Sequence, residues 1–481
     1  MSTKVSVFKK FPRTFWVANS MELFERWAWY GFYMLLANYL TKSTDVGALG
    51  LSQEEKGLIM GIGTAILYFL PIITGAIADR YGYKKILFTA FIIYAIGFLV
   101  MPYCKSFASF FSIFIFIAIG GALFKPVITA TISKTTNDTN SSIGFGIYYM
   151  MVNIGAFIGP LVALHFSKIS YTSVFYLSAI FILVNIPFLF IYKEPEREAS
   201  DLNFLKSLRI IFRNIGIALR DYKFIIFLLI VAGFWSMYYQ LFYTLPVFID
   251  QWVDTHILYD SIKNVWPWLI EKIGSPDGTI KAEYITNIDA MYIIIFQVVV
   301  STIIMKWKPL TSMMTGFFVC SIGMSLTLFT NNPFFIIASI FIFGVGEMAG
   351  SPKITEYIGK IAPKDKIALY MGCAFLPVTI GSSIAGYISG GVYGKMADKL
   401  TLLQKDLSIR GLSVPELSEN FTQTDLFNKA GELLNMTQSE LTNYLWTTYN
   451  PSRIWIVLLG IGAGASFMLF LYDRLLIRKS K

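Results

Sequence analysis

The sequence has few charged residues and few of the residue types that build metal sites. Asp, Glu, Lys and Arg make up 15% of its 481 residues, whereas soluble globular proteins carry about 25%. Its three cysteines, Cys104, Cys320 and Cys373, lie in or beside apolar runs, so a disulfide framework or a metal site has little support. The low charge excludes an ordinary soluble protein, and we expect no metal and no cofactor.

Signatures of nucleotide use and of catalysis are also missing. The sequence has no G-x-x-x-x-G-K loop to cradle phosphates, so ATP-driven activity has no support. Its two histidines, His165 and His256, have no nucleophile and no metal-ligand spacing around them. We therefore expect that the protein is not an enzyme and that any work it does is driven by an ion gradient.

What the sequence does contain is long apolar runs. Hydrophobic residues make up 55% of the chain, and many runs reach the roughly 20 helical residues that cross a ~30 Å hydrocarbon core. The sequence therefore predicts an all-α integral membrane protein with twelve transmembrane helices. The expected spans are 14–40, 57–78, 84–103, 108–132, 142–166, 172–192, 224–250, 286–305, 311–330, 333–360, 367–394 and 453–475.

The net charge is +10, and its cationic residues lie beside the expected spans, where membrane topology would put them. This distribution argues against a nucleic-acid partner. By the positive-inside rule both termini are expected in the cytoplasm of a multi-pass plasma-membrane protein, or an inner-membrane protein in a Gram-negative host. The first apolar run is too long for a signal-peptide core and is expected to be retained. The cations that mark this orientation are Lys4, Lys9, Lys10, Arg13, Arg80, Lys84, Lys85, the group from Lys193 to Lys223, Arg474, Arg478, Lys479 and Lys481.

The twelve expected spans fall into two sets of six. We expect an N-terminal bundle over 1–192, a cytoplasmic linker over 193–223 and a C-terminal bundle over 224–481, with outward-facing insertions near 251–283 and 396–450. The linker has apolar residues at helical spacing and is expected to be an amphipathic interfacial helix. Two six-helix halves joined in this way are typical of the major facilitator fold.

Charged residues occur inside the first expected span. Glu22, Glu25 and Arg26 are three and four residues apart, so they share one helix face, and Tyr30 and Tyr33 continue that face. Charges at membrane depth are costly and usually face a partner or a watered cavity. Protonation of one glutamate would release its ion pair with Arg26, which favours proton coupling. A purely structural ion-pair cluster is the alternative.

Several segments resemble signatures of the proton-dependent oligopeptide transporter family. The resemblance covers both halves of the chain, and the combination is more specific than any one piece. The segments are Glu22 to Gly31, which resembles E-x-x-E-R-F-x-Y-Y-G; Leu123-Phe124-Lys125-Pro126; Phe145 to Phe157 with Tyr148, Tyr149 and Asn153; and Gly346-Glu347-Met348-Ala349-Gly350-Ser351-Pro352. A further segment, Gly75 to Lys85, resembles the superfamily loop motif.

The resemblance implies a symporter that imports di- or tripeptides with protons by alternating access, working as a monomer in the bilayer. The residues implied for proton coupling are Glu22, Glu25, Arg26, Glu347 and Asp289. Those implied for substrate binding are Arg26, Tyr30, Tyr33, Tyr68, Lys125, Tyr149, Asn153, Tyr239, Glu347 and Ser351. Those implied for gating are Gly75, Asp79, Arg80 and Gly82.

Four positions depart from the family pattern. Tyr33 stands where an arginine is usual, Tyr239 where an acid is usual, Ala374 where a tryptophan is usual, and Asp289 adds an acid near the usual Asn-Pro. These changes leave a related proton-coupled transporter for another small zwitterionic or anionic solute as the alternative. A non-transporting membrane receptor or scaffold is the alternative of a different class.

Overall fold

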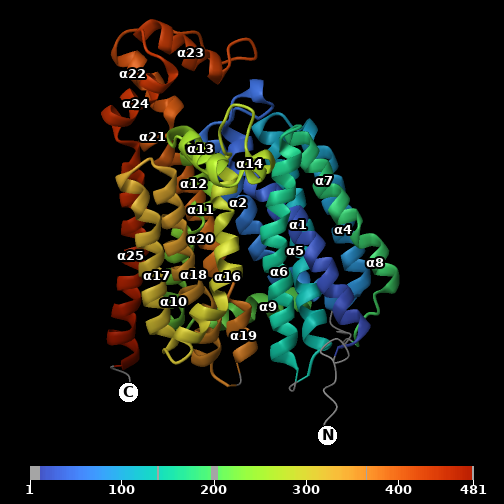
Figure 1. Ribbon diagram of the computed structural model, residues 1–481. Helices are drawn as coiled ribbons and strands as arrows, with labels where there is room; N and C mark the ends of the chain where they lie inside the picture. Colours follow the sequence, from blue (N-terminus) through green and yellow to red (C-terminus); the bar gives the residue numbers. More distant parts are fainter. Residues whose placement is uncertain (1–10, 138–139, 197–203, 365, 479–481) are drawn as a thin grey trace. The chain divides into compact units, whose positions relative to one another are not determined.

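The computed structural model describes residues 11–137, 140–196, 204–364 and 366–478, and these residues are almost entirely helical (Figure 1). Two isolated bridges, Gly274 with Ile280 and Ser418 with Phe421, are the strand-like pairings among them. The prediction of an all-α fold is confirmed. The predicted orienting cations Lys4, Lys9, Lys10, Lys479 and Lys481, and part of the predicted linker, lie outside the described residues.

Long apolar helices account for the predicted spans. Among the described residues, nine helical segments are long and apolar enough to cross a membrane, and a bent pair adds a tenth. Helix α1 (Arg13–Thr41) carries Glu22, Glu25 and Arg26, and α17 (Pro309–Ser325) has 17 residues; neither is among the ten. Both nevertheless coincide with predicted spans, as expected for a twelve-helix plan.

Some spans predicted as continuous are broken. The run 57–78 forms α2 (Gln53–Phe69) and α3 (Pro71–Tyr81), which meet at an angle of 42°. Pro71 begins α3, and a proline has no N–H to continue the preceding helix. The run 224–250 likewise forms three consecutive helices: α10 (Tyr222–Tyr238), α11 (Gln240–Tyr243) and α12 (Leu245–Trp252).

The chain divides into two compact units. The first comprises Met1–Tyr33 and Gly63–Arg220, and the second comprises Met34–Ile62 and Asp221–Lys481, so α1 and α2 contribute to both. Phe32 packs against Phe98, Phe114 and Phe175 in the core of the first unit. Its remaining helices are α4 (Tyr83–Val100), α5 (Phe107–Lys134), α6 (Ser141–Ser167), α7 (Tyr171–Leu183), α8 (Asn185–Ile191) and α9 (Phe204–Ala218).

Glycines allow close helix packing in the second unit. A Cβ on Gly316 of α17 would lie 2.6 Å from the backbone nitrogen of Gly350 in α18, so only glycine permits this approach. Other helices of this unit are α15 (Ala282–Thr286), α16 (Ile288–Ile304), α18 (Pro333–Ile361), α19 (Ile367–Gly372), α20 (Leu376–Tyr387) with the π-helical turn Ile388–Val392, α21 (Tyr393–Met396) and α25 (Ile454–Tyr472).

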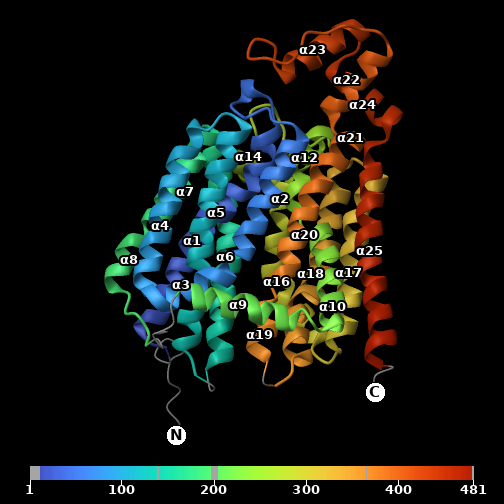
Figure 2. The same cartoon turned by 180° about the vertical axis from the view of Figure 1, so that it is seen from behind.

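Both predicted insertions contain short helices. The region 251–283 holds α13 (His256–Val265) and α14 (Pro267–Ile273). The region 396–450 holds α22 (Lys399–Ile409), α23 (Gln423–Leu434) and α24 (Gln438–Tyr449), drawn in orange-red beyond α21 (Figure 2). Helices α23 and α24 each begin with a capping box, at Thr422 and Thr437.

Candidate functional site

The first unit contains a buried charge cluster on α1. Glu22, Glu25 and Arg26 are 2%, 0% and 5% exposed. Arg26 Nε lies 3.1 Å from Glu22 Oε1, and its Nη2 pairs with Glu25 Oε2. The spacing of three and four residues brings all three groups to one face, as the sequence predicts. One guanidinium therefore faces two carboxylates.

Tyrosines from other helices complete this cluster. Tyr94 of α4 donates its hydroxyl to Glu25 Oε1 at 2.7 Å, and Tyr148 of α6 lies close enough to Glu22 to interact with it electrostatically. The Arg26 guanidinium lies 5.6 Å from the centre of the Tyr30 ring. Sequence reasoning did not identify Tyr94 or Tyr148, because neither is close to Glu22 in the chain.

Lys125 of α5 lies near the same cluster. Its ammonium is 4.1 Å from the centre of the Tyr68 ring and close enough to Glu22 and Glu25 to interact electrostatically with both. Ionised, the four groups Glu22, Glu25, Arg26 and Lys125 sum to zero charge. The charges of these four groups therefore balance within the cluster.

The other predicted substrate residues of the first unit are less uniform. Tyr33 is 4% exposed and shares a 2.7 Å hydrogen bond with Thr64. Asn153 is half-buried, whereas Tyr149 is 63% exposed and meets Tyr148 edge to face. Tyr148, rather than Tyr149, thus contacts the charge cluster.

The second unit holds a pair of acids. Asp289 of α16 is 5% exposed, and its carboxyl group is close enough to that of Glu347 on α18 to interact with it electrostatically. Two ionised carboxylates repel each other, and a proton on one of them relieves this repulsion. Tyr238 of α10 donates to Glu347 Oε1 at 2.9 Å. In the described part of the chain neither acid belongs to an ion pair.

Two further predicted residues lie in the same unit. Tyr239 is 5% exposed and packs against Trp235, Tyr238 and Tyr243. Ser351 is half-buried on α18, one turn beyond Glu347. Tyr239 therefore supplies an aromatic wall where the family pattern has an acid.

Lys56 is a buried cation that sequence reasoning missed. It is 0% exposed, donates to the carbonyl of Tyr243 at 2.9 Å and lies 5.3 Å from the centre of the Tyr393 ring. It precedes the predicted second span by one residue, so it was not considered as intramembrane. The structure places it in the second unit, to which the outer part of α2 belongs.

The loop motif forms the turn between α3 and α4. Gly82 has φ of +102°, a conformation that favours glycine and permits the tight turn. Asp79 accepts a 2.8 Å hydrogen bond from the Tyr83 hydroxyl, and Arg80 lies over the Tyr81 ring. Gly75 sits inside α3, where a Cβ would be 3.7 Å from Pro126.

The first residues after α8 dock onto this turn. Glu194 accepts from the backbone N–H groups of Tyr83 at 2.8 Å and Lys84 at 3.4 Å, which caps the N-terminus of α4. The sequence predicts a gating role for Asp79 but gives no signal for Glu194, which is distant from this turn in the chain.

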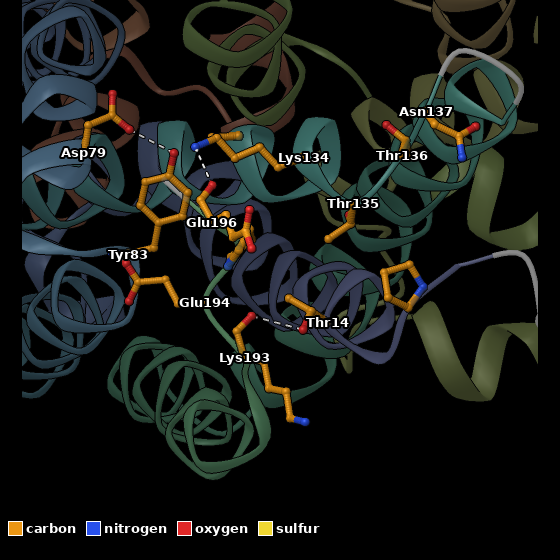
Figure 3. Close-up of a pocket in the computed structure, with 13 residues that line it drawn as sticks. Thr14, Asp79, Tyr83, Lys134, Thr135, Thr136, Asn137, Lys193, Glu194 and Glu196 are labelled. Atoms are coloured by element: carbon orange, nitrogen blue, oxygen red, sulfur yellow. Dashed lines mark hydrogen bonds between the residues drawn. The ribbon is translucent and has the colours of Figure 1, made fainter. Parts of the chain in front are cut away.

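A hollow of about 1140 Å³ opens beside this docked segment. Figure 3 shows Lys134 donating to the carbonyl of Glu196, and Thr14 donating to the carbonyl of Lys193. Most of the residues that line it carry polar or charged side chains. The labelled lining residues are Thr14, Asp79, Tyr83, Lys134, Thr135, Thr136, Asn137, Lys193, Glu194 and Glu196.

Comparison with known proteins identifies relatives among membrane transporters. Residues 20–254 and 256–396 match the Major Facilitator Superfamily. The chain is 30% identical over 190 residues to dipeptide and tripeptide permease A of Escherichia coli strain K12, covering 38% of this chain and 37% of the relative. It is 30% identical over 154 residues to the uncharacterized transporter YclF of Bacillus subtilis strain 168, covering 31% of each. These alignments span about a third of the relatives' length.

Solved structures with the same fold cover nearly the whole chain. A POT family transporter in complex with 5-aminolevulinic acid gives a TM-score of 0.70 at 20% identity, covering 96% of both chains. A POT family transporter in complex with a thioalcohol-conjugated peptide gives 0.71 at 19% identity, with the same coverage. The resemblance predicted from the motifs is thus confirmed, and so is the major facilitator fold.

Proposed function

Because the chain belongs to the Major Facilitator Superfamily, we propose that it is a proton-coupled symporter that imports di- or tripeptides by alternating access. Relatives that carry the name of dipeptide and tripeptide permease support the substrate class. The protein is a transporter and not an enzyme, and it uses no cofactor. Its partners are the peptide, protons and the lipid bilayer, and it works as a monomer.

The observation that carries this proposal is the difference between the two buried charge sets. The first unit offers the cations Arg26 and Lys125, whereas the second offers the acids Asp289 and Glu347. A peptide is a zwitterion, so its carboxylate suits the first set and its ammonium group suits the second. The tyrosines Tyr30 and Tyr68 line the cations.

The acid pair is the stronger candidate for the coupling proton. The carboxylates of Glu22 and Glu25 already face Arg26, whereas Asp289 and Glu347 have no cation in the described structure. Two buried carboxylates are costly when both are ionised, so one shared proton relieves their repulsion. The carboxylate that stays ionised then pairs with the peptide ammonium group, so that proton and peptide are bound together. Protonation of Glu22 or Glu25 would in turn loosen Arg26 for the peptide carboxylate.

The turn between α3 and α4 is proposed as a gating element. Asp79, Arg80 and Gly82 lie there, and Glu194 holds the end of α4. We place this turn and both chain termini on the cytoplasmic side of the plasma membrane, or of the inner membrane in a Gram-negative host. The positive charge at these positions supports this orientation.

A second candidate is a proton-coupled carrier for another small zwitterion or anion. Tyr33 stands where the family usually has a second arginine, so this position offers no cation to a peptide carboxylate. The Tyr33 hydroxyl instead shares a hydrogen bond with Thr64. A solved structure of the same fold was determined with 5-aminolevulinic acid, itself a small zwitterion. A receptor or scaffold without transport has no evident need for these buried charges.

The test is uptake of labelled dialanine by proteoliposomes, with and without an inward proton gradient. We expect gradient-stimulated uptake in the parent protein. Glu347→Gln and Asp289→Asn are expected to abolish the stimulation, because neither variant can pass a proton between two carboxyl groups. Counterflow exchange, which needs no net proton movement, is expected to be retained in part.

Controls separate the candidate functions. Glu432→Gln removes an exposed acid of α23 and is expected to leave uptake unchanged. Absence of dialanine uptake in folded protein would point to another small solute, which uptake of labelled 5-aminolevulinic acid and labelled small carboxylates would identify. A folded protein that moves no solute under any gradient would instead favour the receptor or scaffold.

A further inference from the structure

Helix α9 carries an unusual distribution of charge. Residues 204–220 contain four cations and no Asp or Glu. None of these cations belongs to an ion pair within the described residues. The four cations are Lys206, Arg209, Arg213 and Arg220.

The helix lies on the surface of the first unit. It contacts α3, and in both views it runs across the direction of α5 and α6 (Figures 1 and 2). A helix that spans a membrane would run along those helices. An orientation across them is the one that an interfacial helix adopts.

One side of α9 is exposed along the whole helix. At 100° per residue, the exposed positions form one continuous arc, which we call the outer face of α9. Apolar side chains occupy one edge of this arc, where Leu205 is 70% and Phe212 50% exposed. Cations occupy the other edge. The outer face comprises Leu205, Lys206, Arg209, Phe212, Arg213 and Gly216, and we include with it the exposed Arg220, which lies two residues beyond the end of the helix.

The chemistry of this face identifies its partner. Exposed Leu205 and Phe212 gain free energy by entering an apolar phase, and the neighbouring guanidinium groups match phosphate in geometry and charge. A lipid leaflet offers both partners next to each other: an apolar acyl region and a layer of headgroup phosphates. A helix that lies in the interface can reach the acyl region with one edge and the phosphates with the other. An acidic protein segment would satisfy the cations but would leave the apolar edge in water.

We propose that the outer face of α9 binds anionic phospholipids of the leaflet in which it lies. Leu205 and Phe212 enter the acyl region, and Lys206, Arg209, Arg213 and Arg220 hold phosphate headgroups. The site is independent of the transported solute. It makes the segment between the two halves of the chain a lipid-selective contact.

The experiment places a reporter on this face in the full-length protein. Gly216 is suitable because a Cβ there would meet nothing within 4 Å. The three buried cysteines are replaced by alanine, Gly216→Cys is labelled with a fluorophore, and the protein is reconstituted with phosphatidylcholine and phosphatidylglycerol. Acyl-chain bromine, which quenches the fluorophore, is carried by one lipid or the other at equal mole fraction.

We expect stronger quenching by brominated phosphatidylglycerol. Each cation at a headgroup enriches the anionic lipid about fivefold, and salt reduces the difference. Arg209→Gln with Arg213→Gln is expected to bring the two quenching levels together. The matched control, Lys306→Gln with Lys308→Gln, removes two exposed cations from another loop and is expected to change nothing.

Three outcomes would overturn the proposal. Equal quenching by the two lipids in the parent protein would mean that the face is not selective. No quenching by either, with quenching by aqueous iodide, would mean that the face lies in water. A preference for phosphatidylglycerol that survives Arg209→Gln with Arg213→Gln would mean that other groups recruit the lipid.

Discussion

Gly155 sits where α6 passes closest to the charge cluster of α1. A Cβ on Gly155 would lie 2.4 Å from the Cβ of Arg26, far inside van der Waals contact. The glycine at this position of the Phe145 to Phe157 segment is explained by packing, because any larger residue would push α6 away from Arg26.

We predict that Gly155→Ala impairs transport, since the displaced α6 carries Tyr148 away from Glu22. Uptake in proteoliposomes is expected to fall about fivefold or more, because overpacking typically costs about 1–3 kcal/mol. Gly146→Ala, on the same helix, is the control, because a Cβ there meets nothing within 4 Å. Equal loss in the two variants would show that helix propensity or expression, and not the contact with Arg26, is responsible.

Tyr94 provides a second test at this scale. Its hydroxyl donates to the fully buried carboxylate of Glu25 at 2.7 Å. Tyr94→Phe leaves that carboxylate short of a donor, which costs about 1–3 kcal/mol. The apparent Tm in detergent is expected to fall by a few degrees, whereas Tyr103→Phe, which removes an exposed hydroxyl, is expected to leave it unchanged. An unchanged Tm for Tyr94→Phe would contradict this account of the cluster.

Sequence reasoning predicted the groups that are close in the chain and missed those that are distant. Glu22, Glu25 and Arg26 meet because helical spacing alone brings them together. Tyr94 and Tyr148 reach them from α4 and α6, and which tyrosine of a pair turns inward depends on helix rotation. The resemblance therefore implied Tyr149 as a binding residue, whereas in the structure Tyr148 is the tyrosine close to Glu22.

At the scale of elements, apolar length predicted every span but not the breaks within them. The run 57–78 bends at Pro71, and the run 224–250 breaks near Tyr239 and Thr244. Hydropathy sums over a window, and therefore does not register a lost backbone hydrogen bond. Pro71 itself was the one sequence signal for the bend in the run 57–78, because proline lacks the N–H that would continue the preceding helix.

The insertion between α21 and α25 is attached to the loop between α1 and α2. Thr424, at the start of α23, donates to both carboxylate oxygens of Asp45 at 3.0 Å, and Gln423 donates to the carbonyl of Gly50. Burial opposes ionisation of Asp45, but hydrogen bonds from Ser43 and Thr424 outweigh it and hold the pKa of Asp45 below its usual 3.8.

This contact is predicted to be insensitive to mild acidification. A carboxyl group whose folded pKa is lowered stabilises the contact at every pH above its unfolded value of about 4. The stabilisation is lost only as the pH falls through the lower folded value. Hydrogen exchange of α23 is therefore expected to be unchanged between neutral and mildly acidic pH, after correction for intrinsic rates.

Asp45→Asn is expected to weaken the same contact at every pH at which Asp45 is ionised. A hydrogen bond to a charged group contributes about 1.5–3 kcal/mol when partly buried and less at an exposed position such as this one. Exchange at the start of α23 is expected to rise severalfold, and Glu419→Gln, an exposed acid of the preceding loop, serves as control. Exchange in the parent protein that rises steeply on mild acidification would contradict the assignment to Asp45.

At the scale of the whole molecule, the sequence predicted two halves joined by a linker, and the structure divides the chain at Arg220 and Asp221. The structure also assigns Met34–Ile62 to the second unit. The reason is close packing: a Cβ on Gly57 would lie 2.2 Å from the carbonyl oxygen of Gly386. Hydropathy describes each helix alone, so it did not predict which unit the outer ends of α1 and α2 would join.

The orientation of the chain in the membrane gives the last prediction. The positive-inside rule places both termini and the loop containing Lys306 and Lys308 in the cytoplasm, and the region 396–450 outside. Alkaline phosphatase, which is active only outside the cytoplasm, is expected to be active when inserted in the exposed loop after Gly411 and inactive when fused after Lys481. A fluorescent protein that folds only inside is expected to give the reverse pattern. Because the same rule puts α9 at the cytoplasmic leaflet, phosphatase activity after Lys481 would invert the gating assignment and the leaflet together, while leaving the two buried charge sets as they are.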